Sequence, residues 1–266
     1  MSISKARIRL IIRGDDSGLC GSVNEAVVKA YDKGVLRNTS LQVPAPAFAD
    51  AVLRFRNLPD LCIGLHATIN AEWETPRWGP LLPAARVPSL TDENGLFQSG
   101  FGHAAPDEIM EEVKAQLAAA RAAGLKISYI DEHCCFGWLH DGGLRRRMAR
   151  LAESEGLIYD SMAVGWLPKA EGLFPTLTAA FIAQIEAAPP GLYRHVLHLG
   201  QDLPDMQGLR FRGDAKSAAG SIARERDAEF RLCINPELIS YAASHDVEFI
   251  RFSDLTPAEI HWFTHG

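Results

Sequence analysis

Short apolar stretches typical of β-strands alternate with amphipathic stretches typical of α-helices along most of this chain. The alternation repeats about seven times, which predicts a mainly parallel sheet joined by crossover helices. We expect strands over residues 8–12, 38–43, 61–69, 126–133, 157–164, 191–199 and 247–252. We expect helices over residues 22–34, 47–57, 106–124, 142–156, 176–188, 217–233 and 236–244.

The length of the chain narrows the fold further. A (β/α) barrel takes roughly 250 residues, and the chain has 266. We therefore expect an α/β fold in which residues 1–266 form a single domain, either a TIM-like (β/α) barrel of about seven parallel strands or an incomplete version of it. A doubly wound open sheet is the alternative. Neither a Gly-x-Gly-x-x-Gly pattern nor a P-loop follows the first strand, which weighs against nucleotide binding.

Charge and hydropathy weigh against several classes of partner. The formal net charge of −6 argues against a nucleic-acid partner. No apolar run approaches the roughly 18 residues of a transmembrane helix, so we expect no membrane partner. Residues 1–10 lead into a strand without a signal-peptide pattern, and the odd count of 5 Cys, two of them adjacent, indicates reduced thiols. Both observations predict a cytoplasmic protein.

Two adjacent carboxylates end the first strand. Asp15 and Asp16 lie between Gly14 and Gly18, directly after an apolar run. Buried charge is costly unless it is paired, so such acids usually hold a metal, another cation or a proton. The alternative is that one of them caps the helix that follows.

Other strands also end in polar residues. His66 lies near the end of the third strand, Asp131 and His133 lie at the end of the fourth, and His198 lies at the end of a late strand. In a parallel barrel these ends lie on one face, so the residues converge there. One carboxylate and two imidazoles suit a divalent metal, which lowers the pKa of bound water toward about 7. A second carboxylate is then free to act as general base, and a further histidine can protonate the leaving group.

Each histidine also has a structural alternative. The alternative for His66 is a core histidine with satisfied hydrogen bonds. The alternative for His133 is a residue that only caps the end of its strand. His195 and His198 are three residues apart on a strand and point to opposite faces, so at most one of them faces the pocket. We also expect Asp131 to orient His133 as a hydrogen-bond partner.

The long segment 72–103 interrupts the alternation. It is rich in Pro and Gly and has no sustained period, which is typical of an active-site loop, a lid or a small insertion. Its aromatic residues and those after the fourth strand are predicted either to stack on a bound ligand or to pack within the loops. They are Trp73, Trp78, Phe136 and Trp138.

Several short motifs, taken in order, carry a resemblance to a known family. Their order and spacing are similar to those of the YdjC-like (ChbG/HpnK) family of carbohydrate deacetylases, over nearly the full length. The motifs are GDDSG at 14–18, NTSLQVPAPAF at 38–48, GLHATI at 64–69, PSLTDENGLF at 88–97, DEHCC at 131–135 and HLG at 198–200.

The resemblance implies a distorted (β/α) barrel that removes acetyl groups from N-acetylated sugars or oligosaccharides with one divalent metal ion. It implies that Asp16, His66 and His133 are the metal ligands and that Asp15 is the general base. His198 would be the acid or another pocket residue. Zn²⁺ suits the two imidazoles, and Mg²⁺ remains open. The resemblance also allows a homodimer.

The sequence departs from the family pattern at four residues: Ser17, Cys134, Cys135 and Leu199. The positions that match the metal ligands are kept, whereas residues beside them are changed. A non-catalytic sugar-binding member of the same fold is therefore the alternative function. A metal-dependent hydrolase of a glycosidic or phosphate ester bond is a third hypothesis.

Overall fold

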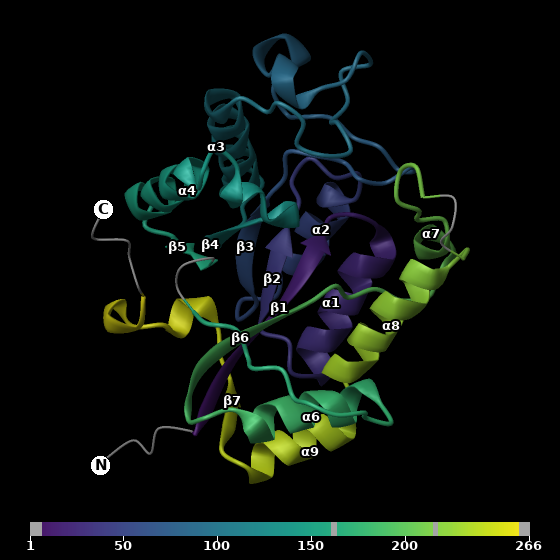
Figure 1. Cartoon of the computed structure of the whole chain (residues 1–266), viewed down its shortest axis with the longest axis vertical. Helices are drawn as coiled ribbons and strands as arrows, with labels where there is room; N and C mark the ends of the chain where they lie inside the picture. Colours follow the sequence, from purple (N-terminus) through teal and green to yellow (C-terminus); the bar gives the residue numbers. More distant parts are fainter. Residues whose placement is uncertain (1–6, 161–163, 215–217, 261–266) are drawn as a thin grey trace.

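A computed structural model describes residues 7–160, 164–214 and 218–260. Its centre is a parallel sheet of seven strands that curls into a half-barrel, with the helices around the outside (Figure 1). The strands are β1 (Ile8–Ser17), β2 (Asn38–Leu41), β3 (Cys62–Ala67), β4 (Ile127–Glu132), β5 (Ile158–Tyr159), β6 (Gly191–Leu197) and β7 (Val247–Phe249). The helices are α1 (Gly21–Lys33), α2 (Phe48–Phe55), α3 (Pro106–Ala122), α4 (Gly143–Ser154), α6 (Leu177–Ala187), α7 (Pro204–Gln207), α8 (Ser221–Cys233) and α9 (Pro236–Ser244).

The order of the strands follows the chain on one side of β1. The sheet runs β5-β4-β3-β2-β1-β6, and β7 pairs with the first residues of β1. An isolated parallel bridge between Trp166 and Arg194 continues the curl beyond β6. The structure thus confirms the α/β fold and the parallel sheet, and it shows an incomplete barrel rather than a doubly wound sheet. Residues 161–163 of the strand expected at 157–164, and residue 217 of the helix expected at 217–233, lie outside the described residues.

The segment 72–103 contains only two short 3₁₀ helices, Ala84–Arg86 and Pro88–Leu90. It lies beyond the carboxyl ends of the strands, at the top of Figure 1. Its first residue, Glu72, contacts His133, so the expectation that this segment reaches the site holds for its beginning. None of the helices in the described ranges is long and apolar enough to cross a membrane.

The outer face of the sheet forms the main core with the helices. Leu10 and Ile12 of β1 are buried in one cluster with Val23 and Val27 of α1. The helical pair is four residues apart, so both side chains lie on the face that α1 turns toward the sheet. Full burial of each such side chain is worth about 1.5–3 kcal/mol.

The inner face of the sheet follows from the two-residue period of a strand. Ile11 and Arg13 of β1 therefore point into the half-barrel, opposite to Leu10 and Ile12. The interior on the amino-terminal side of Arg13 is apolar, because Ile11 is buried there in one cluster with Tyr129 and Phe252. Charged residues begin at Arg13, the next inward-facing residue toward the carboxyl end of β1.

Tyr129 fills the interior below the charged residues. Its ring is fully buried and lies against Gly64, its partner in register on β3. A Cβ atom at Gly64 would lie 2.1 Å from Cε2 of Tyr129. The ring cannot easily move, because it packs at 4.3 Å from the ring of Phe252 and its hydroxyl hydrogen-bonds Ser40 at 2.9 Å.

We expect Gly64→Ala to destabilise the fold by about 1–3 kcal/mol, because the new methyl group overpacks the interior against Tyr129. Urea unfolding of the wild type and the variant measures this difference. Gly165→Ala is the matched control, since among the described residues only its chain neighbours come within 4 Å of the position of its new Cβ. Equal stability of the two variants would contradict the overpacking.

Candidate metal centre

A bulge at the end of β1 brings two consecutive carboxylates into the interior. The register of β1 with β2 shifts between Gly14 and Ser17, and Asp16 has a left-handed backbone with φ of 64°. In a regular strand Asp15 and Asp16 would point to opposite faces. A bulge re-aims a side chain, and aspartate is one of the few residues that tolerate this conformation. Both carboxylates are buried, with 3% and 1% exposure.

Three strand ends bring Asp16, His66 and His133 together. His66 belongs to β3, and His133 directly follows β4. The Nε2 atom of His66 lies 3.4 Å from Oδ1 of Asp16 and 3.2 Å from Nδ1 of His133. The Nδ1 atom of His133 lies 3.3 Å from the same oxygen of Asp16. All three were predicted from their positions at the ends of strands, and the structure places them in one cluster.

The spacing of these donors fits one divalent ion. Donors held at about 2.1 Å from an ion at tetrahedral or octahedral angles lie about 3.0–3.4 Å apart. The three observed separations, 3.2, 3.3 and 3.4 Å, match this geometry. One carboxylate and two imidazoles are also a donor set that Zn²⁺ and similar ions accept.

The electrostatics of the cluster favour positive charge. Burial alone lowers the pKa of His66, but the carboxylates of Asp131 and Asp15 outweigh burial and raise it to about 10. Burial alone raises the pKa of Asp16, but Arg226 and the two imidazoles hold it well below its usual range. Without a metal, a proton on the imidazole therefore supplies the charge that a divalent ion would otherwise bring.

Two residues that contact Asp16 were not predicted from the sequence. Arg226, from α8, donates to Oδ2 of Asp16 at 2.6 Å and leaves Oδ1 to face the imidazoles. Gln42, just after β2, lies 3.0 Å from both Asp16 and His133 through its Nε2 atom. Its Oε1 atom is buried without a partner among the described residues. Gln42 was recognisable as a polar strand end, whereas nothing in the sequence around Arg226 pointed to the site.

Asp15 lies beside the cluster in a network of buried charges. Both of its oxygens accept hydrogen bonds from Arg13 at 2.6 Å. Arg13 also contacts Asp131 at 2.8 Å and forms a close ion pair with Asp160. Asp131 in turn lies 3.2 Å from Nδ1 of His66. The network therefore fixes Asp15 and orients His66.

The expected pairing of Asp131 with His133 is wrong. Asp131 contacts His66, its partner in register on the neighbouring strand. The Nε2 atom of His133 instead lies 2.8 Å from Oε2 of Glu72. Glu72 belongs to the irregular segment, where no periodicity could have predicted the contact.

His198 lies outside the donor cluster but close to it. It is exposed and lines a cavity of about 170 Å³ together with Trp73, Phe211 and Arg226. Arg226 connects this cavity to Asp16. No hydrogen bond or ion pair in the described part of the chain joins the His198 side chain to the three donors.

The predicted aromatic residues divide into buried and exposed ones. Trp73, Trp78 and Phe136 are buried, so their packing within the loops is what the structure supports. Trp138 is 60% exposed. Phe211, which stacks on Trp73 with ring centroids 4.6 Å apart, is 44% exposed and offers a free aromatic face at the cavity.

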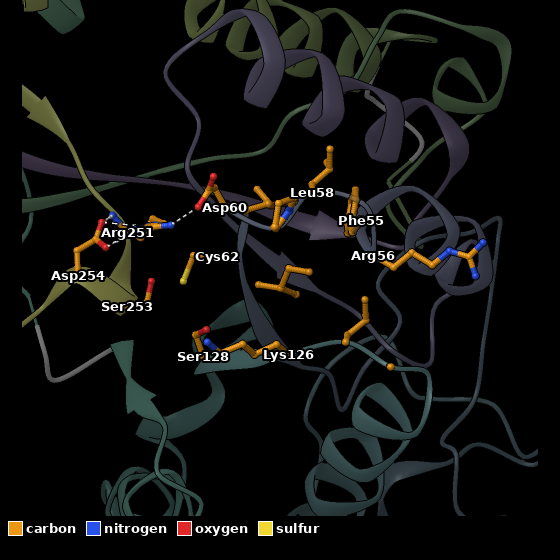
Figure 2. A pocket seen from close by; sticks show the side chains of 15 residues that line it. Phe55, Arg56, Leu58, Asp60, Cys62, Lys126, Ser128, Arg251, Ser253 and Asp254 are labelled. Carbon is orange, nitrogen blue, oxygen red and sulfur yellow. Dashed lines mark hydrogen bonds and ion pairs between the residues drawn. The ribbon is translucent and has the colours of Figure 1, made fainter.

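A second cavity, of about 380 Å³, lies at the opposite edge of the sheet, beside the amino ends of β3 and β4 (Figure 2). Cys62, Lys126 and Ser128 line it, and its Arg251 is already paired with Asp60 at 2.9 Å. The groups of metal donors found among the described residues all lie at the other edge. The geometry therefore favours the carboxyl ends of the strands as the functional site.

Comparison with known proteins assigns the family. The YdjC-like protein family matches residues 9–244. The chain belongs to this family. A carbohydrate deacetylase of Vibrio cholerae is 29% identical over 271 residues, which span 96% of this chain and 99% of the relative. A carbohydrate deacetylase of Thermoanaerobacter pseudethanolicus is 37% identical over 129 residues, which span 47% of this chain and 49% of the relative.

The half-barrel of this YdjC-like chain is also seen in a solved structure. A crystal structure of an Enterococcus faecalis protein matches it with a TM-score of 0.76 at 20% identity, covering 93% of this chain and 98% of that one. This likeness confirms the fold.

The residues in which this YdjC-like chain departs from the family pattern have different surroundings. Ser17 is buried and hydrogen-bonds Thr39 at 2.6 Å. Leu199 is buried beside Gly14, where a Cβ atom would lie 3.2 Å from its Cδ1. These two changes are accommodated by packing and leave the three donors together. Cys134, in contrast, touches His133.

We expect Arg13→Met to lower the free energy of unfolding by about 3–5 kcal/mol, because it leaves the buried carboxylate of Asp15 without its cation. Urea unfolding at neutral pH measures the loss. Arg54→Met is the control, since Arg54 forms a surface pair with Asp50 in which the side chains are 36% and 38% exposed, and its loss should cost at most about 1 kcal/mol. Equal losses in both variants would contradict the larger contribution that we expect from the buried network to the free energy of unfolding.

His195 provides a test of burial at β6. Burial against Phe181 lowers the pKa of His195 from 6.5 to about 4. The unfolded chain therefore binds more protons between these values, and the wild type should lose up to about 3 kcal/mol as the pH falls from 6.5 to 4. His195→Gln should lose less over the same range. Parallel pH profiles of unfolding for the two proteins would contradict the neutral buried imidazole.

Proposed function

We propose that this chain is a metal-dependent hydrolase that removes the acetyl group from an N-acetylated sugar or oligosaccharide. The observation that carries the proposal is the cluster of Asp16, His66 and His133 at the carboxyl ends of three strands, with the spacing of ligands around one ion. Membership of the YdjC-like family and two relatives named carbohydrate deacetylase support the acetylated sugar as substrate.

Each residue of the cluster has a distinct part in holding the ion. Asp16 offers Oδ1 because Arg226 occupies Oδ2. His66 offers Nε2 because Asp131 holds Nδ1, and His133 offers Nδ1 because Glu72 holds Nε2. Such partners on the far nitrogen fix the orientation of the ring and raise its basicity. A divalent ion, Zn²⁺ or Mg²⁺, would supply Lewis-acid polarisation of the acetyl carbonyl and a water of lowered pKa.

Asp15 is the proposed general base. It is the carboxylate next to the cluster, with a donor atom within 4.8 Å of those of His66 and Asp131. Arg13 holds both of its oxygens, which fixes the direction from which the carboxylate can accept a proton from water. A positioned base of this kind typically contributes 10²–10⁴ in rate, on the order of several kcal/mol.

His198 is the proposed acid. The departing sugar amine needs a proton, and the His198 imidazole lies in the cavity that Arg226 and Trp73 connect to the cluster. Phe211 presents its exposed ring at the same cavity, where a sugar face can stack on it.

Two substitutions separate metal binding from proton transfer. We expect His66→Ala to lose the bound ion, and Asp15→Asn to keep it while acetate release from N-acetylated sugar oligomers falls by about 10²–10⁴. Elemental analysis and an acetate assay measure the two quantities. His103→Ala, at an exposed position, is the matched control and should change neither.

The outcomes discriminate between the hypotheses. Full acetate release by Asp15→Asn would show that the base is another residue. Failure of the wild type to bind Zn²⁺ or Mg²⁺ would sink the hydrolase proposal. Binding of an acetylated sugar without acetate release under either metal would favour the non-catalytic sugar-binding alternative.

A further inference from the structure

A second set of donor atoms meets on the other side of the His133 ring. The Nδ1 atom of His133 faces Asp16 and His66. Its Nε2 atom lies 2.8 Å from Oε2 of Glu72 and 3.5 Å from Sγ of Cys134. The donor atoms of Glu72, His133 and Cys134 all lie within 4.8 Å of one another. One imidazole thus stands between two groups of metal-ligating atoms.

The backbone after β4 explains how the thiol reaches this place. Cys134 and Cys135 have left-handed conformations, with φ of 54° and 55°. This conformation is strained for a residue that carries a Cβ atom. In an extended chain the side chains of neighbouring residues point apart, whereas this turn lets the sulfur of Cys134 contact the ring of the preceding His133. Such strain often accompanies a functional site.

A buried amide also contacts the thiol of Cys134. Asn70 is 2% exposed, and its Nδ2 atom lies 3.6 Å from Sγ of Cys134. The thiolate is the form of cysteine that binds metals. The Oδ1 atom of the same amide is buried and has no hydrogen-bond partner in the ranges that the structure describes. The side chain therefore also holds an uncommitted oxygen.

We propose that Glu72, His133 and Cys134 form a second cation position that selects thiophilic divalent ions such as Zn²⁺, Co²⁺ and Cd²⁺ over Mg²⁺. The selectivity follows from the thiolate, because soft sulfur ligands favour these ions and Mg²⁺ prefers oxygen. The observed separation of 3.5 Å between sulfur and nitrogen is close to the ~3.6 Å expected around one tetrahedral ion. Glu72 would move outward from its hydrogen bond by roughly half an ångström.

The two positions compete for the same ring. A neutral imidazole has one nitrogen with a free lone pair, and the other nitrogen carries the proton. An ion in the first position takes the lone pair of Nδ1 and leaves the proton on Nε2, toward Glu72. An ion in the second position takes Nε2, keeps the proton on Nδ1 and releases the thiol proton of Cys134 to solvent. A thiophilic ion in excess therefore opposes occupation of the first position.

Titration with Co²⁺ tests the second position directly, because a cobalt–thiolate bond gives a charge-transfer band in the near ultraviolet. We expect the band in the wild type and its loss in Cys134→Ser. Cys135→Ser is the matched control, since the neighbouring thiol is also exposed and left-handed, and it should keep the band. Cd²⁺ affinity should fall on the order of tenfold or more in Cys134→Ser.

The His66→Ala variant separates this inference from the proposed function. It damages the first position only, so the band should remain. Loss of the band in His66→Ala would mean that Cys134 is an added ligand of the first ion, and it would overturn a separate position. Absence of the band in the wild type, or its persistence in Cys134→Ser, would overturn the role of the thiol. Saturation of the wild type by about two Cd²⁺ per chain would overturn the competition.

Discussion

The pairing of Arg13 with buried carboxylates is the constraint on which the site depends. The inner faces of β1 and β4 and the end of β5 deliver Asp15, Asp131 and Asp160 to one layer of the half-barrel. Ionised carboxylates away from water are costly unless a cation lies among them. Arg13 is that cation, and Asp131 then holds His66 in the orientation that turns Nε2 toward Asp16. The orientation of the donors therefore depends on the charged layer next to them on the amino side of the half-barrel.

The donor cluster lies on the carboxyl side of this layer, and each of its side chains has two polar atoms. Asp16, His66 and His133 each have one polar atom engaged by an outer protein partner and one polar atom facing the centre. Nε2 of Gln42 also contacts the inner atoms of Asp16 and His133. Fixing the outer atom costs side-chain entropy during folding rather than during binding. The outer partners thus fix the orientation of the inner atoms, and His133 differs from His66 because one of its outer partners, Cys134, is a thiol.

The alternation of strands and helices made the parallel sheet predictable, and the polar ends of its strands made Asp16, His66 and His133 recognisable. The period of two along each strand accounts for the rest of the interior, since Ile11 and Arg13 face inward as a regular strand requires. The pairing of strands was not predictable. It sets Asp131 beside His66, across the sheet, rather than beside His133 on its own chain segment. Arg226 and Glu72 come from a distant helix and an irregular segment, where local patterns carry no information on long-range contacts.

The packing of Tyr129 on Gly64 affects how a ligand can reach the site. With Ile11, Phe252 and the Arg13 layer, the ring closes the inside of the half-barrel from below. Among the described residues this packing fills the interior on the amino-terminal side of the donors, which leaves the carboxyl ends of the strands as the side from which a ligand can approach. A ligand that binds from this side also has to leave by it.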